Sequence, residues 1–372
     1  MRYNIIIKVT VLFFLFLSCS CNKEINEERV VNIEKYLTPF FTLDLKDEVL
    51  EDACLECLTI VGDYKVNEIN YIAFLDYLKS TIYLYNNSKD KFESKFKIPK
   101  TCEIADVLWM FNNDSLVYFN NDKSTLVVSD QVRIKNEYKP LNFPYDSSFI
   151  TFTSFDNKLK TYENNFIFNF GISLDDTNID QYRSVSNSIN LLGFFKLTEN
   201  GLYHTPINIK TQIKESGEQS VVNNTIVFAP IEKEKKIVFS HICSDSIYMY
   251  SFVDNSISKF KPPKSRFKIV PQYFNSKNRN PQAYFDALNK QNMCLSLIYS
   301  KKNDLIYRQL LILGNDSNEN YLQVFDLKLN LIKEIYVPSK FYIEEFDGYI
   351  IAKSLNMNNK QLIYEKLDLY IY

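Results

Sequence analysis

The 372-residue sequence predicts an all-β protein built from antiparallel strands, and three observations lead to this prediction. Short segments rich in Tyr, Phe, Ile, Val and Thr alternate with clusters of Asn, Asp, Lys and Ser, which is typical of strands joined by turns. Aromatic residues make up 15% of the chain, enough to fill a large core between pleated surfaces. A hairpin-like pattern also recurs along the sequence. Strands are expected over residues 81–86, 115–120, 125–129, 164–170, 225–229, 236–240, 246–252, 305–313, 321–326 and 348–354, and a helix over 281–292.

The recurring pattern consists of an alternating strand, a polar turn, a second alternating strand and a terminal proline. In two copies, Val337 and Pro338 align without a gap with Ile98 and Pro99. A single hairpin cannot bury its apolar face, so a series of hairpins must stack on one another. With blades of about 50–55 residues, this predicts a single β-propeller of six blades, with seven as the alternative. The copies lie at residues 82–99, 247–263 and 321–338, with a poorer copy at 126–140.

Glycine is scarce, and this affects the expected turns. The chain contains only seven glycines, fewer than a propeller of this size has tight turns. Tight turns need residues that tolerate positive φ, and after glycine these are Asn and Asp. We therefore expect Asn and Asp to occupy the positive-φ positions of the hairpins.

The first residues have the features of an export signal. Arg2 and Lys8 supply positive charge, and residues 5–17 are almost wholly apolar but too short to span a bilayer as a helix. Small residues then lead to two cysteines, Cys19 and Cys21, and the sequence becomes polar. This arrangement resembles the lipobox of bacterial lipoproteins, in which the cysteine is acylated and becomes the first mature residue. The resemblance implies lipidation at Cys21, with Cys19 as the alternative.

The N-terminal features also set the expected boundaries and location. We expect a signal peptide over residues 1–20, a lipidated N-terminus and polar tether over 21–40, and the propeller over 41–372. Lys23-Glu24, followed by further acids, resembles the signal that sends some Gram-negative lipoproteins to the surface of the outer membrane. The prediction is therefore a protein of the cell envelope that is lipid-anchored in the outer membrane. It is exposed either at the cell surface or to the periplasm.

Together, the signal and the repeat resemble the six-bladed β-propeller lipoproteins of unknown function that are common in Gram-negative gut anaerobes. The resemblance covers most of residues 40–372. The sequence lacks the Trp-Asp, kelch and Asp-box signatures of better-known propellers. It implies a fold and brings no catalytic residues with it.

Several kinds of chemistry are disfavoured by composition. The only histidines, His204 and His241, have no metal-ligand spacing around them, which argues against a histidine-based zinc or iron centre. The sequence contains neither a G-x-S-x-G nucleophile elbow nor a glycine-rich phosphate loop. The formal net charge is −2 and no basic block is present, so a nucleic-acid partner is not expected. No cofactor is expected.

The cysteines beyond the signal do not form a disulfide framework. Five remain, an odd number at irregular spacing. Cys54 and Cys57 form a C-x-x-C motif that lacks a second such motif and a thioredoxin-like context. We expect a structural role for this pair, as buried thiols or as a local disulfide, rather than a redox or zinc site. The other three are Cys102, Cys243 and Cys294.

One polar segment resembles a calcium loop. Residues 176–180 carry oxygen donors at alternate positions, beginning with Asp176 and ending with Asp180. Gln181 stands where an EF-hand loop requires glycine, and Asn187 stands where it requires a bidentate glutamate. A solvated loop is therefore the favoured interpretation.

Paired carboxylates could hydrolyse a glycan, and two acidic clusters are candidates. They are Glu344-Glu345 with Asp347, and Glu51-Asp52. Surface solubility is the favoured explanation for both clusters, because nothing in the sequence pairs them in space. The single tryptophan, Trp109, lies in an apolar run typical of a core rather than of a sugar-stacking surface.

The functional prediction is a non-catalytic binding or scaffold module for a protein, peptide or glycan partner. The alternative is an envelope enzyme acting on glycans, with carboxylates at the mouth of the propeller channel. The oligomeric state stays open.

Overall fold

The computed structural model describes most of the chain after the N-terminal segment. The described residues are 31–44, 46–98, 109–112, 115–120, 125–141, 150–153, 159–163, 165–172, 190–209, 218–220, 226–260, 265, 267–270, 273–275, 282, 286–287, 289–313 and 318–369. Cys19 and Cys21 and the signal peptide lie outside them. Of the helix expected over 281–292, residues 281, 283–285 and 288 also lie outside, and residues 282, 286 and 287 are helical. Within this part of the chain, no helix has the length and apolar character needed to cross a membrane.

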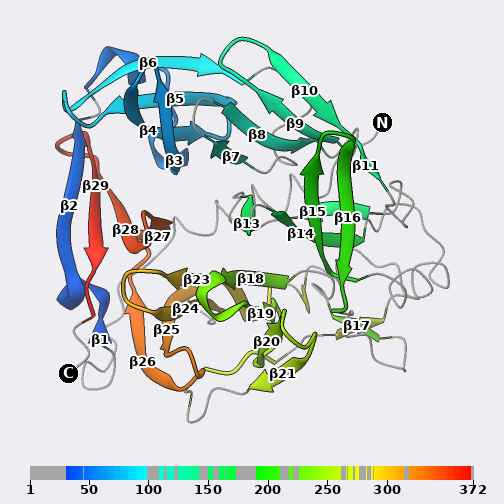
Figure 1. The fold of residues 1–372 in the computed structure, drawn as a ribbon. Helices are drawn as coiled ribbons and strands as arrows, with labels where there is room; N and C mark the ends of the chain where they lie inside the picture. Colours follow the sequence, from blue (N-terminus) through cyan, green and yellow to red (C-terminus); the bar gives the residue numbers. More distant parts are fainter. Residues whose placement is uncertain are drawn as a thin grey trace.

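Six antiparallel sheets are arranged around a common axis as the blades of a β-propeller (Figure 1). Blade 1 contains β3 (Leu58–Val66), β4 (Ile69–Asp76), β5 (Thr81–Asn86) and β6 (Lys91–Lys97). Blade 2 contains β7 (Trp109–Asn112), β8 (Ser115–Asn120), β9 (Thr125–Ser129) and β10 (Ile134–Tyr138). Blade 3 contains β12 (Ile150–Thr153), β13 (Lys160–Tyr162), β14 (Asn165–Ile172), β15 (Leu192–Thr198) and β16 (Gly201–Ile207), with β11 (Pro140–Leu141) parallel to β16.

Blades 4 to 6 complete the ring. Blade 4 contains β18 (Ile226–Ile231), β19 (Lys236–His241), β20 (Ile247–Ser251) and β21 (Ile257–Phe260). Blade 5 contains β23 (Met293–Ser300), β24 (Leu305–Leu313), β25 (Asn318–Phe325) and β26 (Leu331–Val337). Blade 6 contains β27 (Phe341–Phe346), β28 (Tyr349–Asn356), β29 (Gln361–Leu367) and β2 (Leu37–Asp44). A separate two-stranded sheet joins β17 (Glu218–Ser220) to β22 (Tyr273–Asn275).

The structure confirms the six-bladed propeller and explains the sequence repeat. The four hairpin copies are β5–β6, β9–β10, β20–β21 and β25–β26, which are the third and fourth strands of four different blades. Each of these strand pairs lies on the outer side of its blade. The expected strands over 81–86, 115–120, 125–129 and 305–313 have the observed bounds of β5, β8, β9 and β24.

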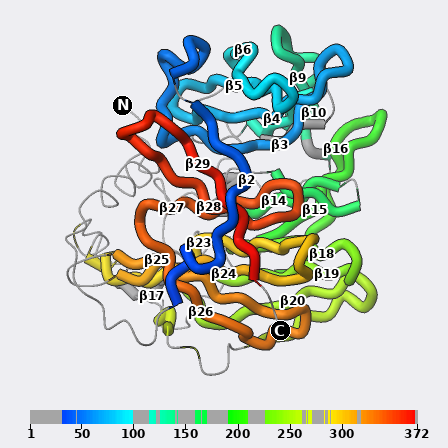
Figure 2. The backbone as a smooth tube through the Cα atoms, turned by 90° about the vertical axis from the view of Figure 1, so that its left-hand side faces the viewer, coloured from blue at the N-terminus to red at the C-terminus, as the bar shows by residue number. Residues whose placement is uncertain are grey.

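The ring is closed by the N-terminal segment, which corrects the expected tether over 21–40. Residues 31–40 belong to the fold. β1 (Val31–Asn32) pairs in parallel with β26 of blade 5, and β2 then pairs antiparallel with β29 to become the outermost strand of blade 6. Figure 2 shows β2, in blue, beside the red strand β29. The charged residues of this segment suggested a tether, but Ile33 and Leu43 are fully buried, and burial of these side chains favours docking.

The hydrophobic core is divided among the spaces between neighbouring blades. Separate clusters of buried side chains join blades 1 and 2, 3 and 4, 4 and 5, 5 and 6, and 6 and 1. Between blades 2 and 3, Phe119 and Phe168 meet edge to face with ring centroids 5.0 Å apart. The high content of Tyr and Phe is therefore explained largely by packing between blades.

Asn and Asp occupy only some of the positive-φ positions. Among the described non-glycine residues with positive φ, five are of the expected types: Asn67, Asp90, Asn255, Asp304 and Asp347. Other residue types occupy the rest of these positions, including Lys235 and Leu329. Local turn geometry therefore overrides the residue preference at several hairpins.

Candidate functional site

The first acidic cluster is divided among structural contacts. Glu344 lies on β27 and forms an ion pair with Lys353 of β28, with 3.2 Å between Lys353 Nζ and a carboxylate oxygen. The Glu344 side chain also accepts a hydrogen bond of 3.1 Å from the backbone N–H of Ile60, and Lys353 Nζ donates one of 2.6 Å to the carbonyl of Leu58. Both charged side chains therefore connect blade 6 to blade 1.

Of the remaining members of this cluster, Glu345 lies near the end of β27 and Asp347 lies in the β27–β28 turn. A carboxylate oxygen of Glu345 accepts a hydrogen bond of 2.8 Å from the N–H of Gly348. Asp347 has φ 50° and lies close enough to Asp63 of β3 that its charge helps to raise the pKa of Asp63, after the larger effect of desolvation. Asp63 and Asp347 thus belong to neighbouring blades and influence each other electrostatically. We refer to these two residues as the acidic pair, and only Asp347 was a sequence candidate.

The second acidic cluster lies on the surface. Asp52 forms an ion pair with Lys95 of β6, and its hydrogen bond to Lys95 is the largest cause of the lowered pKa of Asp52. Glu51, its neighbour, is exposed. No second described carboxylate contacts Asp52, so this cluster does not form a paired-acid site.

Both histidines are buried among aromatic rings. His204 lies 5.0 Å from Phe195 between ring centroids, and His241 lies 5.6 Å from Tyr248. Desolvation lowers the pKa of each histidine to about 4, with a smaller contribution from Lys259 at His241. Neither belongs to a group of three or more metal-ligating side chains within the described residues. They remain neutral at physiological pH.

The C-x-x-C motif forms a local disulfide between Cys54 and Cys57, one of the two structural roles considered from the sequence. The loop that it closes is held by Asp76, which is fully buried. The Asp76 carboxylate accepts hydrogen bonds from the backbone N–H groups of Cys54 at 2.7 Å, Leu78 at 3.1 Å and Lys79 at 3.1 Å. Sequence reasoning missed Asp76, although an aspartate at the end of a strand is a known signal for such a turn.

Arg308, which is buried, was also not singled out from the sequence. Arg308 on β24 has no exposed surface and connects blade 5 to blade 4. It donates to Cys294 Sγ at 3.4 Å, to Ser240 Oγ at 3.2 Å and to the backbone carbonyl of Asp245 at 3.2 Å. It also donates to Gln323 at 3.3 Å and to the carbonyl of Ser244. No described carboxylate pairs with Arg308. Within the described residues, the N–H groups of its guanidinium donate only to neutral acceptors.

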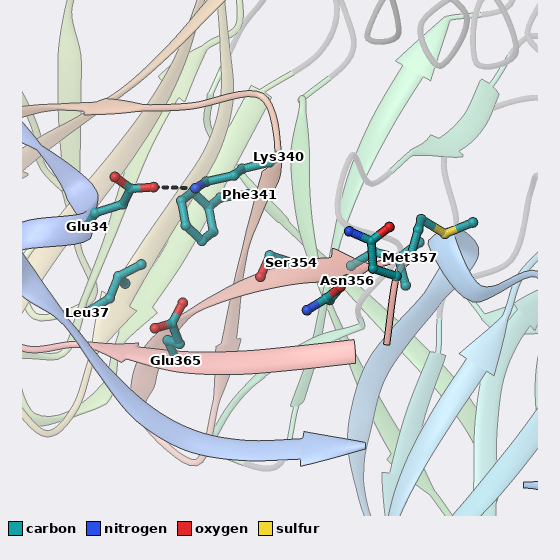
Figure 3. A pocket seen from close by; sticks show the side chains of 10 residues that line it. Glu34, Leu37, Lys340, Phe341, Ser354, Asn356, Met357 and Glu365 are labelled. Atoms are coloured by element: carbon teal, nitrogen blue, oxygen red, sulfur yellow. Dashed lines mark ion pairs between the residues drawn. The ribbon is translucent and has the colours of Figure 1, made fainter. Parts of the chain in front are cut away.

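A groove lies on blade 6, beside the N-terminal segment that closes the ring. Its volume is about 520 Å³, and we refer to it as the blade 6 groove. Figure 3 shows side chains from the N-terminal segment, from the start of β27 and from β28 and β29 around one space. The lining residues are Glu34, Leu37, Lys340, Phe341, Ser354, Leu355, Asn356, Met357, Asn358 and Glu365.

The groove is lined by more negatively charged than positively charged side chains. Glu34 and Lys340 form an ion pair and both side chains are exposed. Glu365 is partly buried, and its carboxylate forms no hydrogen bond or ion pair with any described residue. Desolvation raises the pKa of Glu365, Lys340 lowers it, and Glu34 raises it further. The groove thus holds two carboxylates and one ammonium group.

Several sequence candidates cannot be placed. Asp176, Asp180 and the rest of the calcium-like segment, as well as Cys102, lie outside the described residues. The backbone of Trp109 is in β7, whereas its side chain is outside the description.

Comparison with known proteins relates this chain to others through its fold. No protein-family model matches the sequence, and no curated protein does. The fold is similar to the crystal structure of a member of the DUF4221 family from Bacteroides vulgatus, with 14% identity, a TM-score of 0.60, and coverage of 89% of this chain and 97% of that one. It is also similar to a Bacteroides fragilis protein described as exported, with 11% identity, a TM-score of 0.51, and coverage of 92% and 97%.

Proposed function

We propose that this six-bladed propeller is a lipid-anchored protein of the cell envelope that binds a protein, peptide or glycan partner without transforming it. One observation carries the proposal. Most of the sequence's candidate acids are engaged in holding the fold together: Glu344 joins two blades, Glu345 stabilises a turn, and Asp52 pairs with Lys95. Carboxylates held in this way are poorly placed to donate or accept protons in catalysis.

The proposed location rests on the N-terminal sequence. An apolar segment of signal-peptide length precedes Cys19 and Cys21, and the structurally similar Bacteroides fragilis protein is described as exported. Several acyl chains on one cysteine would make anchoring effectively permanent. Labelling of cells with a fatty-acid analogue tests the anchor. We expect the label to be lost in Cys21→Ala and in the double variant with Cys19→Ala. Label that survives in the double variant would refute lipidation at either residue.

The acidic pair favours a second candidate function, an envelope enzyme acting on glycans. Asp63 and Asp347 come from neighbouring blades, and the pKa of Asp63 is raised, as is usual for a general acid. In that role Asp63 would protonate the leaving oxygen and Asp347 would act as the base or nucleophile.

A single experiment separates the two functions. Full-length protein, extracted in detergent, is applied to arrays of glycans and peptides, and each bound ligand is examined for turnover. The binding function predicts saturable binding without turnover, unchanged in Asp63→Asn and Asp347→Asn. Hydrolysis of a glycan that disappears in either variant would establish the enzyme instead.

A further inference from the structure

We propose that the blade 6 groove binds the basic side chain of a peptide, with the ammonium or guanidinium group held by Glu365. This inference deepens the proposed binding function, on which it rests, by naming a site and a ligand class. The observation behind it is a carboxylate that faces a groove and forms no hydrogen bond or ion pair within the described part of the chain.

Charge is the first step of the argument. Two carboxylates, those of Glu34 and Glu365, face one ammonium group, that of Lys340. The exposed Glu34–Lys340 pair satisfies those two groups, so one negative charge is left at Glu365. Because Glu365 is partly desolvated, a cation placed beside it would be attracted more strongly than at an open surface. The groove therefore favours a cationic ligand and disfavours an anionic one.

The shape and apolar lining narrow the class of cation. Leu37, Phe341 and Met357 line the same groove, and the Met357 side chain is 67% exposed. Lysine and arginine carry their charge at the end of an aliphatic stem, which packs against apolar side chains while the head remains polar. A volume of about 520 Å³ is sufficient for such a side chain with its backbone. A hydrated metal ion would leave these apolar surfaces without contacts.

Neutral polar groups complete the site. Ser354 and Asn356 line the groove near Glu365 (Figure 3). The side-chain oxygen of Asn356 accepts a hydrogen bond of 3.2 Å from the N–H of Asn359, and the same side chain carries two N–H donors. Peptide carbonyls are suitable acceptors, whereas a free alkylamine has none. A peptide therefore fits the groove better than a simple amine.

The test uses full-length protein in detergent and two acetylated, amidated tetrapeptides of sequence Ala-Leu-X-Ala, in which X is lysine or norleucine. These probes differ in the terminal ammonium group of one residue. We expect the lysine peptide to bind and the norleucine peptide to bind at least roughly tenfold more weakly in isothermal titration calorimetry. Equal affinity for the two peptides, or no binding of the lysine peptide, would overturn the inference.

Three variants localise the effect. Glu365→Gln should weaken binding of the lysine peptide about tenfold. Lys340→Gln should strengthen it several-fold because a competing positive charge is removed. Glu199→Gln, at the exposed β15–β16 turn of blade 3, should leave affinity unchanged. Opposite signs at Glu365 and Lys340 would not arise from a general loss of folding, which thermal unfolding of each variant also monitors.

Failure of the inference about the groove can be distinguished from failure of the proposed binding function. If array ligands bind the wild type and Glu365→Gln equally, the partner site lies elsewhere on the propeller and only the inference about the groove is refuted. If a bound glycan is hydrolysed and this turnover depends on Asp63, the binding function itself is wrong.

Discussion

Lys353 and Glu344 form a buried ion pair on adjacent strands of blade 6, and each also hydrogen-bonds the backbone of blade 1. The two side chains are only 4% and 9% exposed. Their contacts with Leu58 and Ile60 span 295 and 284 positions of sequence. This pair therefore helps to hold the first complete blade of the ring against the last.

Removal of one partner of this pair should destabilise the protein strongly. Lys353→Met leaves Glu344 buried without its counter-ion, which typically costs about 3–5 kcal/mol. The double variant Lys353→Met with Glu344→Leu should cost clearly less than the sum of the two single variants. Urea unfolding at pH 7 measures these free energies. Strictly additive losses would contradict energetic coupling between the two residues.

Arg308 should be irreplaceable by another cation. Lysine has three donors on a point charge, and it cannot reproduce the planar set of contacts that Arg308 makes with blades 4 and 5. We expect Arg308→Lys to lower the free energy of unfolding by about 2–4 kcal/mol. Arg133→Lys, at an exposed turn, serves as the matched control and should change it by less than about 0.5 kcal/mol. A similar effect of both substitutions would rule out a special role for Arg308.

Gly348 should not tolerate a side chain. Its φ is 77°, and a Cβ at this position would lie 3.3 Å from Lys301 Cβ. Its carbonyl also accepts a hydrogen bond of 2.6 Å from Ser300 Oγ, which limits backbone adjustment. Gly348→Ala should therefore cost about 1–3 kcal/mol. The matched control is the opposite change at another turn, Asn67→Gly, where φ is 47°. We expect this control to change the free energy of unfolding very little. Thermal unfolding of both variants measures the difference.

Stability should fall on acidification through the buried histidines. Their pKa values are about 4 in the folded protein and about 6.5 when unfolded. Between these values the unfolded chain binds more protons, so the free energy of unfolding decreases as pH falls from about 6.5 to 4. Each histidine should contribute roughly 2–3 kcal/mol to this loss. Urea unfolding from pH 7 to 4.5 should show a shallower decrease in His241→Phe than in the wild type, and an unchanged slope would contradict this assignment.

Much of the fold follows from local sequence patterns. Alternation of apolar and polar residues located β5, β8, β9 and β24, because side chains on a strand face opposite sides with a period of two. The recurring hairpin with its terminal proline indicated stacked blades, and its four copies proved to be the outer strand pairs. The export-signal pattern of the first residues is equally local, and the location that it indicates stays a prediction.

The sequence alone therefore determined a subset of the strands, the repeat and the propeller, since each depends on residues that are near neighbours in the chain. Only the tertiary structure decided that residues 31–44 close the ring, that Asp63 and Asp347 influence each other across two blades, and that Glu365 lines a groove. Among the described residues, no side chain forms a hydrogen bond or ion pair with the Glu365 carboxylate. The tertiary structure also decided that Lys353 and Arg308 are buried. These features depend on contacts between residues far apart in sequence, and no local period records which polar side chains will meet when the blades pack together.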